Sequence, residues 1–236
     1  MYLFYTNDIR DGLAWFSEEE ARHFSQVLRK RKGDAIHFVD GKGGWYEGFA
    51  VETGKKHFVA EITDNKEVRG QKNFNLHIAI APTKNMDRFE WFLEKATEIG
   101  IDEITPLHCE HSERNKIRAD RLEKILLAAM KQSLRAWLPR LNELTDFQTF
   151  ISGYMPESFE NRFIAHCQED NLPHLKDQCE TGKKVTILIG PEGDFSQREI
   201  SLATLAGFKS VSLGKARLRT ETAGIAACHI VNLLNE

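Results

Sequence analysis

Two segments near the C-terminal end of the chain combine glycines, arginines and carboxylates at a spacing suited to ligand binding. The first, residues 190–194 (Gly-Pro-Glu-Gly-Asp), directly follows an apolar run over 185–189 that predicts a strand. Two glycines around a proline give a tight turn whose backbone can approach a ligand closely. A helix starting just beyond the turn leaves unpaired N–H groups. A Gly-Pro-x-Gly string is also a common plain turn, and this alternative stays open.

The second segment, residues 213–223, reads Leu-Gly-Lys-Ala-Arg-Leu-Arg-Thr-Glu-Thr-Ala and follows a predicted strand over 210–213. Arg217 and Arg219 alternate with Leu218, so the loop can turn both guanidinium groups one way and the apolar side chain the other. Thr220 is predicted to cap the next helix, where the Glu221 carboxylate is favoured by the helix dipole. A helix cap alone would also explain Thr220 and Glu221.

The two segments are neither a dinucleotide fingerprint nor a phosphate-binding P-loop, because the sequence lacks Gly-x-Gly-x-x-Gly and Gly-x-x-x-x-Gly-Lys-Ser/Thr. Both segments follow predicted strands. In open α/β sheets, ligands bind outside the carboxyl ends of strands. The residues therefore predict an α/β domain with two adjacent ligand loops.

The elements that must position these loops alternate between strand and helix from residue 74 onward. Apolar runs predict strands over 74–81, 103–107, 162–166, 185–189 and 210–213. Helical spacing predicts helices over 86–99, 122–133, 196–207 and from 220 to the C-terminus. Ser196 and Glu199 form a capping box at the third of these helices. Such alternation predicts a parallel sheet covered by helices.

The first seventy residues predict a small β-rich unit with one helix. Strands are expected over 2–5, 35–39, 45–51 and 58–63, and Trp45 and Tyr46 are interpreted as hairpin or core residues. Ser17 and Glu20 form a capping box at a helix over 17–28. The polar residues 65–73 are interpreted as a linker.

The composition is that of an ordinary globular chain: 236 residues, 41% hydrophobic and 28% charged, with a formal net charge of -3. This total does not by itself indicate a nucleic-acid partner. No signal peptide or membrane-spanning run is recognised. Four cysteines without a Cys-x-x-Cys pair are typical of reduced thiols in the cytoplasm. His108-Cys109-Glu110-His111 has no second ligand cluster at zinc spacing, so no metal is expected.

Five features in the same order resemble the SPOUT superfamily, and most closely its RsmE family, which makes N3-methyluridine in small-subunit ribosomal RNA. These features are His23 with Val27-Leu28-Arg29, the string Lys95–Gly100, Gln132-Ser133 with Arg135 and Pro139, residues 190–194, and Arg219–Ala223. Asp194 departs from the pattern, because many relatives have a second glycine there. Aspartate tolerates a positive φ better than most residues, so the departure does not exclude the turn. Lys215-Ala216 is also less apolar than usual.

The resemblance implies an α/β trefoil-knot SPOUT methyltransferase domain (74–236) preceded by a small PUA-like RNA-binding β-barrel domain (1–70). It implies S-adenosylmethionine as cofactor and a homodimer. The last helix has an apolar face suited to that interface, although the face could equally pack on its own sheet. The residues expected to bind the cofactor, largely through the backbone, are Leu188, Gly190, Gly193, Leu213, Gly214, Leu218 and Thr222.

The implied reaction is methylation of N3 of a specific uridine in small-subunit (16S) ribosomal RNA. The substrate is either the assembled subunit or the naked RNA. Its main tasks are alignment and removal of the N3 proton. Arg219 is expected to stabilise the negative charge that then spreads onto the flanking oxygens. Glu221 either accepts the proton or orients Arg219, and Glu192 is a weaker candidate base.

Binding of RNA is expected to rest on phosphate contacts. The candidate residues are His23, Arg29, Lys30, Lys32, Lys84, Arg114 and Arg135. The basic run 29–32 would also suit the C-terminus of a helix without any RNA. Two alternatives keep the fold: a ribose 2′-O-methyltransferase, or a non-catalytic RNA-binding ribosome-assembly factor. The chain is expected to be cytoplasmic, with no membrane or metal partner.

Overall fold

The computed structural model of the chain describes residues 1–54, 56–63, 67–154 and 161–236. Contacts divide the chain into two units, Met1–Gln71 with Leu127–Leu138, and Lys72–Leu126 with Pro139–Glu236. Residues 127–138 therefore pack with the first unit although they lie within 74–236 in the sequence. Of the predicted linker over 65–73, residues 65 and 66 lie outside the described residues. Within the described ranges, no helix is both long and apolar enough to cross a bilayer.

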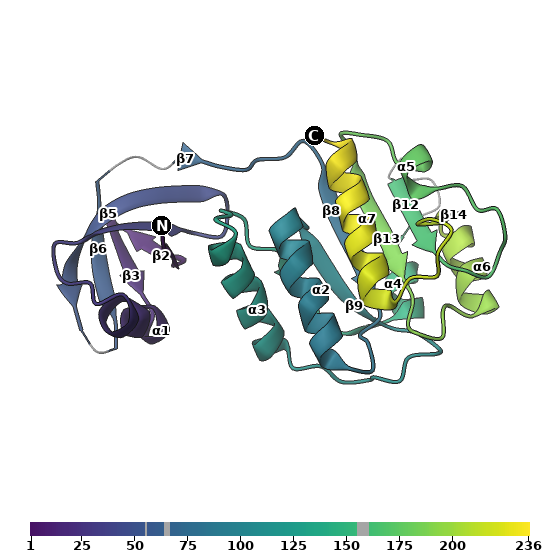
Figure 1. Cartoon of the computed structure of the whole chain (residues 1–236), viewed down its shortest axis with the longest axis horizontal. Coiled ribbons are helices and arrows are strands. Elements are labelled where there is room, and N and C mark those ends of the chain that lie inside the picture. The colour runs from purple at the N-terminus through teal and green to yellow at the C-terminus, as the bar shows by residue number, and fades with distance from the viewer. Residues whose placement is uncertain (55, 64–66, 155–160) are drawn as a thin grey trace. The chain divides into compact units, whose positions relative to one another are not determined.

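The first unit is a curled sheet closed on one side by a short helical segment (Figure 1). Its strands follow the order β1-β4-β5-β6-β3-β2, and β7 pairs with β5. The elements are β1 (Leu3–Tyr5), β2 (Asp8–Arg10), β3 (Leu13–Phe16), α1 (Glu18–Arg22), the π-helical turn η1 (His23–Val27), β4 (Ala35–Val39), β5 (Gly44–Thr53), β6 (Phe58–Ile62) and β7 (Glu67–Val68).

Aromatic side chains fill the concave side of this sheet. The Phe58 ring stacks on Phe16 at a centroid distance of 4.1 Å and on Phe24 at 4.5 Å. The predicted strands are present, but the hairpin of β2 and β3 was missed. Asp11 and Gly12 form its turn with φ of 50° and 75°, and the Asp-Gly pair is a strong local signal for such a hairpin. Trp45 and Tyr46 are buried, as expected.

Only one of the two hydrogen bonds of the predicted capping box at Ser17 is present. The Ser17 hydroxyl accepts a hydrogen bond from the Glu20 N–H, but the Glu20 carboxylate instead meets the Lys131 ammonium at 2.5 Å. Glu20 is 3% exposed, and a buried carboxylate is stabilised far more by a cation than by a neutral N–H group. Burial raises the pKa of Glu20, and Lys131 opposes that rise.

The second unit contains a parallel sheet in the order β10-β9-β8-β13-β12-β14, with β11 also pairing β9. Its elements are β8 (Asn75–Ile80), α2 (Met86–Ile99), β9 (Glu103–His108), α3 (Ala119–Gln132, whose last residues pack with the first unit), β10 (Arg140–Leu141), β11 (Thr145–Asp146), α4 (Phe147–Ser152), β12 (Asn161–Ala165), α5 (Leu175–Gln178), β13 (Lys184–Ile189), α6 (Gln197–Leu205), β14 (Lys209–Val211) and α7 (Thr220–Leu234).

Helices cover both faces of this sheet. Helices α2 and α7 lie side by side over β8 and β13 (Figure 1). Their close packing requires Gly224, because a Cβ there would lie 2.6 Å from the Phe92 ring. On the other face, α4 and α6 enclose a core that includes Phe195 and Phe208. The expected parallel sheet covered by helices is therefore confirmed. The trefoil knot remains a prediction based on the family resemblance.

His77 is a titratable group inside this sheet. It is 5% exposed, and its Nε2 lies 2.7 Å from the Thr105 hydroxyl. Burial lowers the pKa of His77 to about 4, although the nearby Glu103 carboxylate acts in the opposite direction. The folded protein therefore holds this imidazole neutral near pH 7.

Candidate active site

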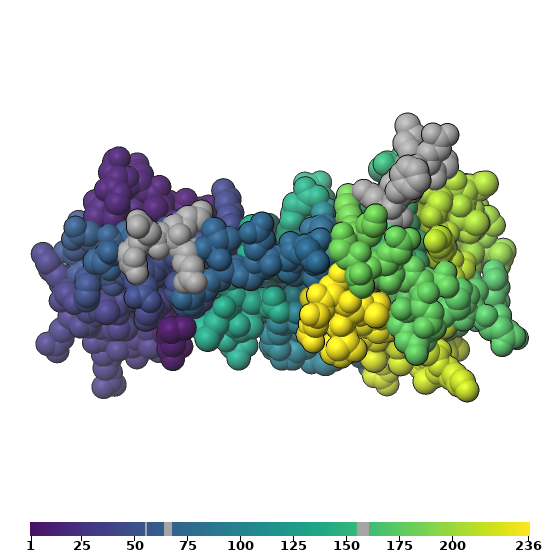
Figure 2. Space-filling model, turned by 90° about the horizontal axis from the view of Figure 1, so that it is seen from above, coloured from purple at the N-terminus to yellow at the C-terminus, as the bar shows by residue number. Residues whose placement is uncertain are grey.

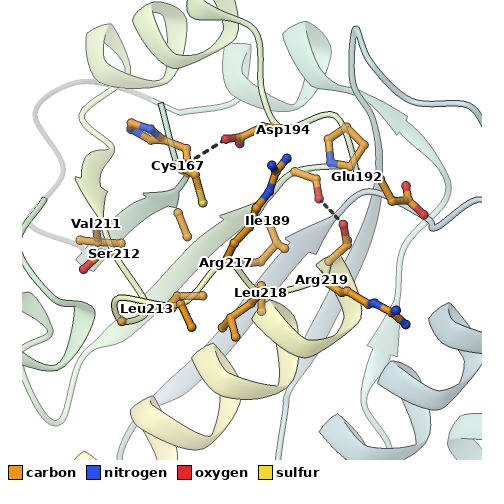
Figure 3. Close-up of a pocket in the computed structure, with 18 residues that line it drawn as sticks. Cys167, Ile189, Glu192, Asp194, Val211, Ser212, Leu213, Arg217, Leu218 and Arg219 are labelled. Carbon is orange, nitrogen blue, oxygen red and sulfur yellow. Dashed lines mark hydrogen bonds between the residues drawn. The ribbon is translucent and has the colours of Figure 1, made fainter. Parts of the chain in front are cut away.

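Three neighbouring strands of the second unit end at one level. Ala165 of β12 is in register with Ile189 of β13 and Val211 of β14. Parallel strands present their carboxyl ends at the same edge, so the loops that follow meet there. They enclose a cavity of about 310 Å³ (Figure 3), a size typical of small-molecule sites.

The loop over residues 190–194 forms one wall of this cavity. Asp194 has a φ of 64°, the conformation that favours glycine and that aspartate tolerates. Its carboxylate accepts hydrogen bonds from the N–H groups of Cys167 at 2.9 Å and Phe195 at 2.8 Å. The aspartate thus ties this loop to the one after β12, a contact that glycine would not provide.

The basic loop and the start of α7 form the opposite wall. Thr220 was predicted to cap α7, but the N-cap residue is Arg219, with φ -71° and ψ 156°. The Thr220 hydroxyl instead donates to the Gly190 carbonyl at 3.0 Å, and Thr220 is 5% exposed. This prediction was wrong because the long-range carbonyl takes the hydroxyl that a local cap would use. The hydrogen bond joins the two predicted loops directly.

The two arginines of the basic loop point in different directions, contrary to the expectation of one shared side. In Figure 3, the Arg217 side chain points across the cavity toward the 190–194 loop, and Arg219 points away from it toward a neighbouring helix. Arg219 borders both this cavity and a second one, which is also bounded by Asp87, Arg88 and Trp91 of α2. The loop therefore separates two adjacent spaces.

Glu221 lines the second cavity and is 7% exposed. Its Oε1 lies 3.9 Å from Nε of Arg88, whose side chain is 42% exposed. Sequence reasoning did not select Arg88, because nothing in the helix pattern of 86–99 distinguishes it from a solvated surface residue. The two predicted catalytic residues thus meet at the second cavity, together with a cation from α2.

The expected cofactor residues divide into three groups. Gly190, Leu213, Gly214 and Leu218 line the first cavity. Leu188 is fully buried inside β13, and Gly193 faces His111, where a Cβ would lie 3.0 Å from the histidine Cβ. Thr222 borders the second cavity.

Sequence reasoning missed the loop after β12. His166 and Cys167 both line the first cavity. The His166 Nδ1 accepts the Gln168 N–H at 3.2 Å, and its Nε2 lies 2.9 Å from the Ser210 hydroxyl. Burial lowers the pKa of His166. The position of these residues at the end of a predicted strand was the available signal.

Glu192, the weaker candidate base, takes part in a network between loops. It lines the first cavity, and its carboxylate accepts the Lys84 N–H at 2.9 Å. The Lys84 ammonium lies 2.7 Å from Glu113, which raises the lysine pKa, and Arg114 donates to the Lys84 carbonyl at 2.7 Å. Lys84 and Arg114 are therefore brought together, but within a network that also holds carboxylates.

The remaining predicted RNA contacts belong to the first unit. They are His23, Arg29, Lys30, Lys32 and Arg135. The His23 ring stacks on Tyr2 at 4.2 Å. Lys30 donates to the Ala35 carbonyl at 2.8 Å, which ties the basic run to β4.

The His108–His111 segment has structural contacts. Cys109 is buried, and burial raises its thiol pKa. His111 Nδ1 lies 3.0 Å from the Asp194 carbonyl oxygen. In the part of the chain that the structure describes, no three His, Cys, Asp or Glu side chains gather as a metal site would require.

Comparison with known proteins identifies two matching families and several relatives. Residues 70–232 match the family described as RNA methyltransferase domain, and residues 16–63 match RNA methyltransferase PUA domain. Ribosomal RNA small subunit methyltransferase E of Synechocystis is 30% identical over 222 residues, which are 92% of this chain and 72% of that protein.

Solved structures give the same result for the fold. A "probable rRNA-methyltransferase" from Porphyromonas gingivalis is 41% identical, with a TM-score of 0.90 over 100% of this chain and 98% of the other. Ribosomal RNA small subunit methyltransferase E from Neisseria gonorrhoeae, bound to S-adenosyl methionine, is 27% identical, with a TM-score of 0.85 over 99% and 98%. The PUA-like and SPOUT-type fold classes implied by the sequence are therefore confirmed.

Proposed function

Because this chain belongs to the RNA methyltransferase family that includes ribosomal RNA small subunit methyltransferase E, we propose that it methylates N3 of a specific uridine in small-subunit ribosomal RNA. The observation that carries this proposal is the pair of adjacent cavities that share Arg217, Leu218 and Arg219. One space can hold a methyl donor and the other a base, and reaction requires the two to be held in line. The ribosomal substrate implies action in the cytoplasm.

The first cavity fits S-adenosylmethionine. Ile189, Val211 and Leu218 give it apolar walls, and the turns at 190–194 and 212–219 bring backbone N–H and carbonyl groups to its edge. This combination of apolar surface and a few polar groups is typical of small-molecule and cofactor sites. When bound, this cofactor supplies a methyl group on a sulfonium, which is already a good leaving group.

The chain must make the uridine nitrogen nucleophilic. N3 bears a proton at neutral pH, and its loss spreads negative charge onto the two flanking carbonyl oxygens. The Arg219 guanidinium, exposed at the border of both cavities, is suited to stabilise that charge. Because this interaction is strongest after deprotonation, it favours the reacting state over the bound substrate.

We assign to Glu221 the acceptance of the N3 proton, with Arg88 holding its carboxylate at the second cavity. Glu221 is only 7% exposed, and its carboxylate lies 3.9 Å from Nε of Arg88, which also lines the second cavity. Glu221→Gln keeps the shape of the side chain but cannot accept a proton at this step. We expect this variant to lose methyl transfer and to keep its affinity for the cofactor. Normal methyl transfer by the variant would mean that Glu221 only orients Arg219.

The family resemblance further implies an RNA-binding N-terminal unit and a homodimer. The basic run 29–32 would contact phosphates. On α7, the residues that pack inward are Gly224, Ala227, Cys228 and Val231, whereas Leu233 is 56% exposed and Ile225 and Ile230 are only partly covered. Figure 2 shows the end of α7, in yellow, at the surface. Exposed apolar positions on α7, with Trp91 of α2 at 44% exposure, would suit a second copy of the chain.

The decisive experiment is mass spectrometry of small-subunit ribosomal RNA nucleosides from cells that lack this protein. The same RNA is then treated with purified protein and S-adenosylmethionine, with the Arg219→Ala variant as the matched control. We expect RNA from these cells to lack N3-methyluridine. Treatment with the unaltered protein should restore this nucleoside, and treatment with Arg219→Ala should not. Loss of a ribose-methylated nucleoside instead would overturn the target, and no change in any methylated nucleoside would favour an assembly factor.

A further inference from the structure

Trp137 presents a fixed, partly exposed indole ring on the first unit. Its side chain is at the surface, with 42% of the residue exposed. The indole N–H donates to the Arg69 carbonyl at 2.9 Å, which fixes the orientation of the ring. The ring packs directly on Gly43, since a Cβ there would lie 2.4 Å from Cζ2 of the indole. An aromatic ring already held in place by such contacts loses little entropy when a ligand stacks on it.

The backbone beneath this ring is rigid. The Gly43 N–H donates to the Ala136 carbonyl at 2.9 Å, and the Gly43 carbonyl accepts the Arg69 N–H at 3.0 Å. The Leu138 N–H donates to the Gly41 carbonyl at 2.9 Å. These bonds join three segments, the 40–44 turn, residues 69–70 and residues 136–138, into one platform that carries the indole. All three segments belong to the first unit.

An exposed cation, Lys42, lies next to Trp137. Lys42 forms an antiparallel bridge with Trp137, which places the two side chains next to each other. Arg69 is exposed, and its guanidinium lies 4.3 Å above the Trp45 ring. The carboxylate of the turn, Asp40, is directed inward: it accepts N–H groups of Lys42 and Gly44, both at 2.8 Å, and the residue is 9% exposed.

We propose that Trp137 is a stacking platform for an unpaired base of the RNA substrate, with Lys42 beside it for an adjoining phosphate. Unpaired bases stack on aromatic side chains in RNA recognition, and nearby cations follow the backbone. This inference rests on the proposed function, because it adds a contact of the substrate outside the two cavities.

The test measures binding of the full-length protein to a fluorescein-labelled single-stranded RNA of mixed sequence, and to the same oligonucleotide with abasic positions. Trp137→Ala is expected to raise Kd for the intact RNA roughly 5-fold to 150-fold, the effect of losing one base–aromatic stack. The abasic RNA is expected to bind the two proteins about equally. Phe49→Ala, which removes another exposed aromatic residue of the same unit (46% exposed), serves as the matched control and should leave Kd unchanged.

A second pair of variants keeps the test decisive if Trp137→Ala does not fold. Trp137→Phe retains an aromatic face and should bind RNA more tightly than Trp137→Leu, which retains only apolar volume. Lys42→Gln should lower the slope of log Kd against log salt by about one. An unchanged Kd in Trp137→Leu, or an equal loss of affinity for intact and abasic RNA, would overturn the platform.

The failure of this inference is distinguishable from the failure of the proposed function. Methyl transfer by the unaltered protein, with RNA affinity insensitive to Trp137, would refute the platform alone. RNA affinity that depends on Trp137 without any methyl transfer would support the platform and refute the reaction.

Discussion

Replacing Thr220 with valine should destabilise the protein and weaken cofactor binding, although the side chain keeps nearly the same shape. The Thr220 hydroxyl donates to the Gly190 carbonyl at 3.0 Å, and Thr220 is only 5% exposed. Valine has nearly the same volume but no donor, so the buried carbonyl loses this partner. Leaving such a group unpaired costs about 1–3 kcal/mol of unfolding free energy. Thr220→Ser keeps the hydroxyl and serves as the control, with an expected loss of about 1 kcal/mol or less for one methyl group.

The same bond joins the two loops of the cavity, so its loss should also weaken cofactor binding. If the full 1–3 kcal/mol organises the loops, Kd for S-adenosylmethionine rises by at most about 5-fold to 150-fold. Chemical denaturation measures the first effect, and calorimetric titration of the folded variants measures the second. A valine variant as stable as the serine variant, and binding the cofactor equally well, would refute the idea that this hydrogen bond holds the site together.

Three further predictions concern catalysis, RNA binding and pH. Arg219→Ala should abolish methyl transfer while leaving cofactor affinity within a few-fold, since its proposed role is in the transition state; single-turnover transfer and cofactor titration measure the two, and near-normal turnover would contradict the role. Changing Arg29, Lys30 and Lys32 to glutamine together should weaken RNA binding and flatten its salt dependence; an unchanged slope would move the phosphate contacts elsewhere. Folding lowers the pKa of His77 to about 4, so the unfolded chain takes the proton first. The contribution of neutral His77 to the free energy of unfolding is therefore fully present above about pH 6.5. It is lost as the pH falls from about 6.5 toward 4, and the total loss is at most roughly 3 kcal/mol. Unfolding of His77→Gln should show a shallower fall, and equal slopes would exclude His77 as the cause.

Local signals in the sequence were sufficient wherever the structure depends on neighbouring residues. Helix α2 has the predicted bounds, Met86–Ile99, because the apolar spacing and Gly100 are both local. The capping box of Ser196 and Glu199 is also formed as predicted. The positive φ of Asp194 follows from a turn four residues long. In each case, the favourable contact lies within a few positions along the chain, where pattern and propensity carry the information.

The sequence by itself therefore determined the fold class, the two loops and the family, whereas the tertiary structure decided what those loops meet. The strand order placed Ala165 level with Ile189 and brought the missed loop after β12 into the cavity. It also directed the Thr220 hydroxyl to a carbonyl thirty positions away and set Arg88 beside Glu221. Such contacts depend on how helices and strands far apart in the chain pack together. The periodicity of a single segment predicts which face is buried, but not which distant residue covers it.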